Sequence, residues 1–147
     1  MPGTLTHSPA DILRWCLIDL GHGTAPSDGL AWPVSVGGEL ATPDNAVTIY
    51  DTQGVGHGRT NPDRERQEHH GVQVRVRGIN QLVGYQKARQ IAIALDGEIE
   101  LTPVVRDSSD FTIHAVTRTT DVIALGREPE GKRWIFTINA IASIREG

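Results

Sequence analysis

The chain has 147 residues, of which 38% are hydrophobic and 22% charged, and its formal net charge is −4. These values are typical of one globular domain with its own hydrophobic core. The acidic balance argues against tight, non-specific binding to nucleic acid, which requires a basic surface. The lone Cys16 excludes an internal disulfide and a paired-cysteine zinc site. We expect no secretory signal, because Pro9 and Asp11 interrupt the N-terminal stretch, and no apolar run reaches membrane-spanning length.

The first predicted element is a helix over residues 9–20. Ser8 can cap it, and Pro9 suits its first position because the N–H that proline lacks would be unpaired there. Gly21 is the expected left-handed terminator. Apolar residues recur at helical spacing along one face of this segment, at Ile12, Leu13, Cys16, Leu17 and Leu20.

Glycine and proline dominate residues 21–43, which predicts mostly turn and loop. Within this region, residues 32–36 are expected to form a short edge strand, since Pro33 is barred from the centre of a sheet. Residues 46–50 are rich in β-branched side chains and predict a second strand.

Residues 51–71 lack any periodic apolar pattern, so they are expected to form one long loop between the second and third strands. Loops of this length are usually functional or disordered. It is either a flexible excursion or a segment that becomes ordered against a partner. Its candidate assembly residues are Gly54, Gly56, Gly58, Arg59, Arg64 and Arg66.

Residues 72–78 alternate strictly between valines and polar side chains, which predicts a strand with one buried face. The other face carries Gln73, Arg75 and Arg77. This row is either an ordinary solvated face or a contact surface for a neighbouring subunit. Arginine suits a contact surface because its planar guanidinium pairs with carboxylates.

A second helix is predicted over residues 80–95, followed by strands over 98–105, 111–118, 121–125 and 134–144. Pro103 weakens the first of these strands, and residues 126–132 predict a turn. This order indicates an α+β protein, with a largely antiparallel sheet and two helices packed on one face. In the second helix, the side expected to face solvent carries Asn80, Gln81, Gln86, Lys87, Arg89 and Gln90, and the inner stripe carries Tyr85, Ala88, Ile91, Ala92 and Leu95.

The glycine-rich stretch at residues 54–58 does not match a phosphate-binding loop. A P-loop requires a Lys-Ser/Thr pair that opens a helix, and a dinucleotide fingerprint requires a third glycine with a following helix. Ser108, Ser109 and Asp110 are typical of a turn.

The histidines offer little more chemistry. His69 and His70 are adjacent, and adjacent side chains of an extended chain point to opposite sides, so they would seldom bind one metal ion. We therefore expect no enzyme, metal or cofactor. A small enzyme that uses His57, His69, His70 and His114 remains an alternative, as does a regulatory ligand-binding domain.

An ordered set of motifs extends from about residue 10 to residue 144. The sharpest is the Val-Gln-Val-Arg-Val-Arg strand of residues 72–77 before a Tyr-x-x-Ala helix. In this order the chain resembles the tail-terminator proteins of long-tailed bacteriophages, also called tail completion or minor capsid proteins. The other matching segments are Leu20-Gly21, Val47-Thr48-Ile49-Tyr50-Asp51-Thr52, Gly84-Tyr85-Gln86-Lys87-Ala88, Leu125-Gly126-Arg127, Lys132-Arg133 and the strand that reaches Asn139.

The resemblance implies an α+β structural subunit that forms a hexameric ring at the head-proximal end of the tail tube. Such a ring stops tube polymerisation and contacts the head connector or stopper protein, while DNA passes through its lumen without specific binding. It also implies a place in the virion tail or neck after assembly in the host cytoplasm. The expected interface is then Gln73, Arg75 and Arg77, with the long loop against the tube or a neighbouring subunit. Another head–tail connector subunit, such as a stopper or head-completion protein, is the alternative.

Overall fold

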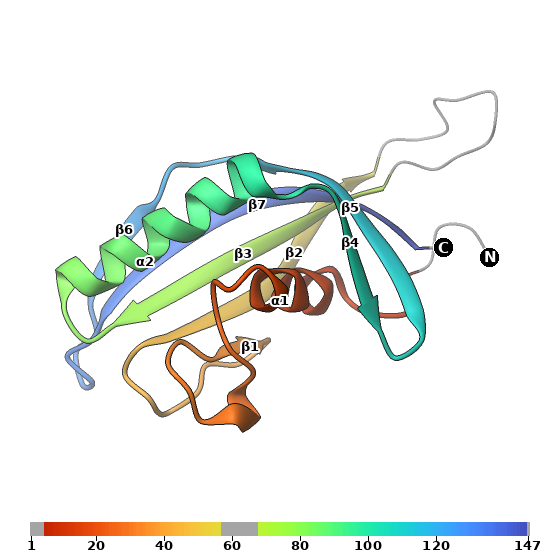
Figure 1. The fold of residues 1–147 in the computed structure, drawn as a ribbon. Coiled ribbons are helices and arrows are strands. Elements are labelled where there is room, and N and C mark those ends of the chain that lie inside the picture. The colour runs from red at the N-terminus through yellow and green to blue at the C-terminus, as the bar shows by residue number, and fades with distance from the viewer. Residues whose placement is uncertain (1–4, 57–67, 147) are drawn as a thin grey trace.

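The computed structural model describes residues 5–56 and 68–146 of the chain. It has two α-helices and seven strands, joined in places by short irregular turns (Figure 1). The elements in chain order are α1 (Pro9–Asp19), the 3-10 turn η1 (Pro26–Asp28), β1 (Val34–Val36), β2 (Ala46–Gly56), β3 (Glu68–Gly78), α2 (Gln81–Ile93), the π-helical turn η2 (Ala94–Glu98), β4 (Glu100–Arg106), β5 (Ser109–Arg118), β6 (Ile123–Arg127) and β7 (Trp134–Glu146).

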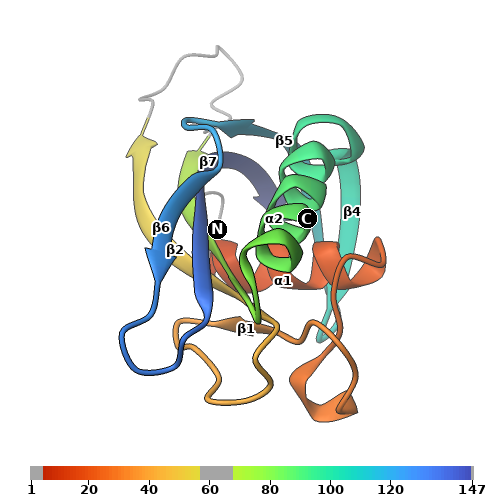
Figure 2. The same ribbon diagram turned by 90° about the vertical axis from the view of Figure 1, so that its left-hand side faces the viewer.

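The strands form one curled sheet in the order β1-β2-β3-β7-β5-β4, and β6 pairs with β7 on the same side as β5. Only β1 and β2 pair in parallel; the other named pairs are antiparallel. Both helices lie within the curve of the sheet (Figure 2). The predicted α+β class is confirmed.

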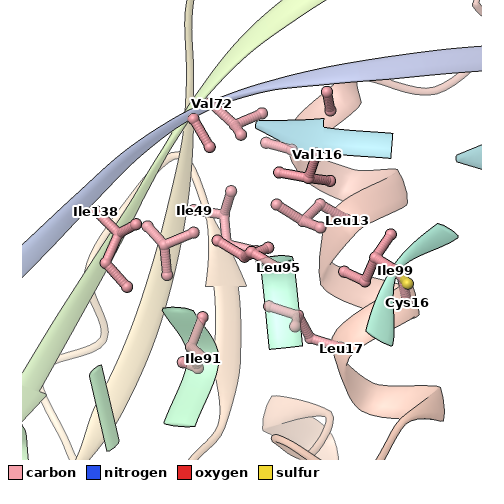
Figure 3. Close-up of a cluster of buried hydrophobic side chains, with 14 of the residues drawn as sticks. Leu13, Cys16, Leu17, Ile49, Val72, Ile91, Leu95, Ile99, Val116 and Ile138 are labelled. Atoms are coloured by element: carbon pink, nitrogen blue, oxygen red, sulfur yellow. The ribbon is translucent and has the colours of Figure 1, made fainter. Parts of the chain in front are cut away.

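The concave face of the sheet carries the core. Val72, Val74 and Val76 of β3 are fully buried, as their alternation predicted. They belong to one hydrophobic cluster with residues of both helices, including Leu17 of α1 and Ile91 of α2 (Figure 3). Helix α1 contacts β1, β2, β3 and β4, so it covers the open side of the curl between the two outermost strands.

Local signals at the start of α1 act as predicted. The Ser8 side chain accepts a hydrogen bond from the Asp11 backbone N–H, and Pro9 occupies the first turn. A second acceptor comes from far along the chain, because Asp51 Oδ1 of β2 accepts from the Ala10 N–H at 2.9 Å. Gly21 follows the helix with a φ of +85°.

The prediction of a long loop over residues 51–71 is wrong at both ends. Strand β2 continues to Gly56 and β3 begins at Glu68, with Gly56 paired to Glu68 and Val55 to His69. Backbone hydrogen bonds hold such a ladder without an apolar periodicity, so the sequence pattern missed it. A register shift between Thr52 and Val55 marks a β-bulge in this arm.

Three smaller predictions also change. Strand β4 is not broken by Pro103, because β4 is the last strand of the sheet and a proline at a free edge removes no ladder bond. Lys87 was expected to face solvent, yet it is only 8% exposed. Its ammonium lies 5.2 Å from the centroid of the Trp32 ring, which reaches it from the segment before β1. Tyr85, assigned to the inner stripe, is instead 45% exposed.

Candidate assembly surface

The convex face of β3 carries the predicted interface row, and each of its side chains has a partner within the chain. Gln73 Nε2 donates to Asn139 Oδ1 of the neighbouring β7 at 3.0 Å. Arg75 Nε lies 2.9 Å from Glu39 Oε1 in an ion pair, and both side chains remain partly exposed. Gln73 and Arg75 are therefore oriented by their neighbours and still reachable from outside.

Arg77 occupies a different environment, since it is only 3% exposed. Its Nη2 donates to the Pro43 carbonyl at 2.6 Å and its Nε to the Asp44 carbonyl at 3.2 Å. Burial, and then the neighbouring Arg133, lower the pKa of Arg77 below its ordinary value. Arg77 is thus a buried cation that fixes the backbone of the segment passing over it.

Arg133 also holds the segment of residues 37–45 in place through a hydrogen bond and an ion pair. Arg133 Nη1 donates to the Ala41 carbonyl at 2.9 Å and lies 3.7 Å from Asp44 Oδ1. Arg133 Nε also pairs with Glu128 Oε1 at 2.8 Å. Because this segment also carries Glu39, its position decides where the carboxylate facing Arg75 lies. Sequence reasoning missed the segment, since its contacts come from strands far along the chain.

Tyr50 of β2 lies opposite Gln73 in the β2–β3 ladder. Burial, and then the nearby Glu39 carboxylate, raise the pKa of its phenol above the ordinary value. Four side chains thus lie together on one part of the convex face. We call this set the convex patch: Glu39, Tyr50, Gln73 and Arg75.

Only part of the predicted assembly loop lies within the described residues. Gly54 and Gly56 lie in β2 rather than in a loop. Gly58, Arg59, Arg64 and Arg66 fall outside the described residues, as does His57.

The remaining candidate histidines are not gathered into one site. His69 and His70 lie in β3, opposite Ser143 and Ala142 of β7. His114 lies at a bulge of β5, on the far side of β7. Among the described residues, no group of three or more His, Cys, Asp or Glu side chains could hold a metal ion.

Two open hollows lie beside α2. One, of about 400 Å³, is lined by Tyr85 and Ile93 together with polar side chains. Its rim includes His22, whose Nε2 lies 3.1 Å from Glu98 Oε2 and whose Nδ1 lies 2.8 Å from Gln90 Nε2. The other, of about 660 Å³, is lined by Arg89, Asp96 and residues 116–121. Neither is lined by His69, His70 or His114.

The fold and this surface define an α+β protein with one hydrophobic cluster under a curled sheet and an arginine-bearing convex face. Residues 16–146 match the family described as bacteriophage tail terminator protein, and the chain belongs to that family. Its members are structural proteins of the phage tail, which places this chain among virion proteins and confirms the resemblance drawn from its motifs. No curated protein matches the chain. Within the described ranges, no helix has both the length and the apolar character needed to cross a membrane.

Proposed function

We propose that this protein is the ring-forming terminator that caps the head-proximal end of the tail tube and joins it to the head connector. The family match over residues 16–146 is the observation that carries this proposal. DNA passes through the lumen of the ring without specific binding, and the net charge of −4 favours such passage because an acidic subunit does not retain DNA.

A ring requires heterologous contacts, in which one patch on each subunit meets a different patch on the next. The convex patch supplies one of them. The Arg75 side chain stays partly exposed while its ion pair with Glu39 offsets its charge in the free subunit, so a neighbouring carboxylate can share the same cation. Gln73 adds a polar group whose amide is already oriented by Asn139.

Arg77 contributes to this contact indirectly. It is buried under residues 37–45, so it holds the segment that carries Glu39 rather than meeting a neighbour itself. Charge reversal at Arg77 would therefore test folding, whereas charge reversal at Arg75 tests assembly.

Residues 57–67 connect the ends of β2 and β3, and both strands continue beyond the part that β1 covers. We place this connection, with Gly58, Arg59, Arg64 and Arg66, against the tail tube or the neighbouring subunit. Protease cleavage within residues 57–67 should slow on assembly. Equal cleavage rates in free and assembled protein would remove the loop from the proposal.

The central experiment compares wild type, Arg75→Glu and Lys132→Glu by negative-stain electron microscopy and sedimentation velocity. Wild type and Lys132→Glu should form rings, because Lys132 is an exposed cation of the β6–β7 turn, outside the convex patch. Arg75→Glu should assemble poorly while its far-UV circular dichroism is unchanged. Undiminished assembly of Arg75→Glu would exclude the convex patch as a contact.

Binding to purified components separates the terminator from the alternative connector subunit. The terminator should bind tail tubes that lack a head, with one ring at one end of each tube. Binding to filled heads, with no binding to tubes, would instead assign the chain to the stopper or head-completion proteins.

A further inference from the structure

Asp28 and Asp96 are each followed directly by a glycine. Because glycine has no Cβ, its backbone nitrogen can approach the carboxyl group of the preceding aspartate closely. Attack of this nitrogen on the carboxyl carbon is the first step in the isomerisation of aspartate to isoaspartate. The two Asp-Gly pairs have the same local chemistry, so a difference in their reactivity must come from the structure around them.

Asp28 lies at the exposed tip of a small loop. It ends the 3-10 turn η1, in which no residue is buried, and Gly29 follows with a φ of +66°. One backbone hydrogen bond closes η1, from the Asp28 N–H to the Ala25 carbonyl at 3.0 Å. Within the described residues, the Asp28 carboxylate has no hydrogen bond or ion pair. This carboxyl group is therefore free to turn towards the Gly29 nitrogen.

Hydrogen bonds close this loop at its base. We call residues 24–32 the η1 loop. The Thr24 N–H donates to the Trp32 carbonyl at 3.0 Å, and Thr24 Oγ1 donates to the Ala31 carbonyl at 2.9 Å. The η1 loop projects from the body of the molecule below α1 (Figures 1 and 2), and residues 26–31 are all exposed. The turn at Asp28 can therefore open without uncovering a buried side chain, so its opening costs little free energy.

Asp96 is held by both its backbone and its side chain. It lies within η2, where Ala94 and Leu95 are fully buried, and the Ile99 N–H donates to the Ala94 carbonyl at 3.1 Å. Arg118 donates to both carboxylate oxygens, from Nε to Oδ1 at 2.9 Å and from Nη2 to Oδ2 at 2.7 Å. Opening of this turn would disturb core side chains and break a bidentate ion pair.

Arg118 also keeps Asp96 in its charged form. Its hydrogen bonds lower the pKa of the Asp96 carboxyl below the ordinary value. Ring closure requires the neutral carboxylic acid, because the acid can release its hydroxyl group as water whereas the carboxylate has no such leaving group. The second Asp-Gly pair is thus shielded by its position and by its charge.

We propose that Asp28 is a modification site at which the main chain isomerises spontaneously to isoaspartate, and that the contacts of Asp96 protect the second Asp-Gly pair. The Gly29 nitrogen forms a bond to Cγ of Asp28, its proton leaves with the carboxyl hydroxyl as water, and a succinimide ring results. Water then adds to the main-chain carbonyl carbon of this ring and breaks the bond from that carbon to the Gly29 nitrogen. The chain now continues through Cγ, whereas addition of water at Cγ restores aspartate.

The product has one more carbon atom in its main chain at residue 28, and the former main-chain carbonyl becomes a free carboxylate. Because the hydrogen bonds of Thr24 close the η1 loop at its base, the change stays within the loop, and Trp32 keeps its contact with Lys87. Modified chains should therefore remain folded. Structural subunits of a virion are not replaced after assembly, so isoaspartate would accumulate as the particle ages. The inference does not depend on the proposed ring.

Ageing of the purified full chain at pH 7 and elevated temperature tests the site. Isoaspartate is measured by enzymatic transfer of a labelled methyl group to the new carboxylate. Tryptic peptides separate the sites, because residues 15–59 contain Asp28 and residues 90–106 contain Asp96. In the folded chain, isoaspartate should form at residue 28 about tenfold faster than at residue 96. In guanidinium chloride the two rates should be equal, since only the local sequence then acts.

Two variants test the chemistry and the protection separately. Asp28→Glu keeps the negative charge but would have to close a larger ring, so the methyl-accepting product should disappear from the peptide of residues 15–59. Arg118→Gln removes the ion pair of Asp96 and should raise the rate at residue 96 by about fivefold, with the rate at residue 28 unchanged. Far-UV circular dichroism checks that both variants keep the fold, and the comparison of folded with unfolded wild type needs no variant.

A fast reaction at residue 28 of the folded wild type, its loss in Asp28→Glu and a faster reaction at residue 96 in Arg118→Gln together support the inference. Equal rates at the two residues in the folded wild type would overturn it, and so would an unchanged rate at residue 96 in folded Arg118→Gln. Product that persists in the peptide of residues 15–59 of Asp28→Glu would assign the reaction to another aspartate and equally overturn it. Ring formation is tested separately by Arg75→Glu, so failure of one proposal leaves the other intact.

Discussion

At the scale of single residues, the buried cations Arg77 and Lys87 show how differently the chain accommodates charge. Arg77 satisfies its guanidinium with two backbone carbonyls of residues 37–45. Lys87 has the Trp32 ring over its ammonium, and no hydrogen bond or ion pair to it is found within the described part of the chain. Burial lowers the pKa of Lys87 below the ordinary lysine value of 10.5, because the folded protein disfavours the charged form of this side chain.

We expect Lys87→Met to raise the free energy of unfolding at pH 7 by about 1 kcal/mol, because methionine keeps the apolar stem and removes a buried charge. Folding lowers the pKa of Lys87, so the unfolded chain holds the ammonium proton more tightly than the folded one. The free-energy cost of burying the charged side chain is therefore fully present below the pKa of the folded state. It fades as the pH rises towards 10.5, and the difference between wild type and variant should shrink there. Urea unfolding at pH 7 and pH 10.5 measures both effects, with Lys132→Met as the exposed control. A variant that is less stable than wild type at pH 7 would show that the contact with Trp32 outweighs the burial.

Cys16 gives a prediction about reactivity. Burial, and then the Asp19 and Glu98 carboxylates, raise the pKa of its thiol to about 12. The thiolate is the form that attacks the reagent's disulfide and releases its leaving thiolate, so the folded protein should not react with a disulfide reagent at pH 8, and one thiol per chain should appear in denaturant. Absorbance of the released thiol product follows this directly. Complete reaction within minutes in native buffer would contradict the buried position of Cys16 on α1.

At the scale of elements, the junction between β3 and α2 depends on close backbone approach. Gly78 ends β3, and a Cβ built there would lie 2.5 Å from the Gly84 Cα of α2. A Cβ on Gly84 would lie 2.8 Å from Cε2 of the buried Phe136. The Asn80 side chain caps α2 by accepting from the Val83 N–H at 2.9 Å, so the helix begins immediately after this contact. Two glycines therefore set the distance between the helix and the sheet.

Gly84→Ala should lower the free energy of unfolding by about 2 kcal/mol, since overpacking against Phe136 outweighs the better helix propensity of alanine. Gly97→Ala is the matched control, because a Cβ there meets nothing within 4 Å. Thermal and urea unfolding of both variants measure the difference between their free energies of unfolding. Equal stability of the two would mean that α2 moves away from β7 at little cost.

Local patterns accounted for most elements because they act within a few residues. The cap at Ser8 and the valine alternation of β3 predicted their elements correctly. The extension of β2 and β3 beyond Thr52 and Gly71 was missed, because a hairpin ladder is held by the opposite strand and not by any periodicity of its own.

At the scale of the whole molecule, one hydrophobic cluster joins α1, the sheet and α2. The two ends of the described chain are also tied together, since the Thr6 N–H donates to Glu146 Oε1 at 2.8 Å. With α1 packed against four strands, the sheet has no separate half that keeps its own core. Unfolding should therefore be cooperative.

We expect tryptophan fluorescence and far-UV circular dichroism to give coincident urea transitions. The three tryptophans lie in different places, with Trp15 in α1, Trp32 before β1 and Trp134 in β7, so fluorescence reports on distant regions. Separate midpoints for the two signals would contradict a single cooperative unit.

The sequence by itself determined the α+β class, the caps of α1, the buried face of β3 and the family of the protein, because these depend on residue types at short spacing. The candidate interface remains a prediction, and the sequence specified its geometry only in part. The row of Gln73, Arg75 and Arg77 was recognised, but its division into two accessible side chains and one buried support came from residues 37–45. The burial of Lys87 likewise followed from a neighbour distant in the chain. Spacing along a chain specifies which side of an element a residue occupies, whereas the tertiary structure decides what covers that side.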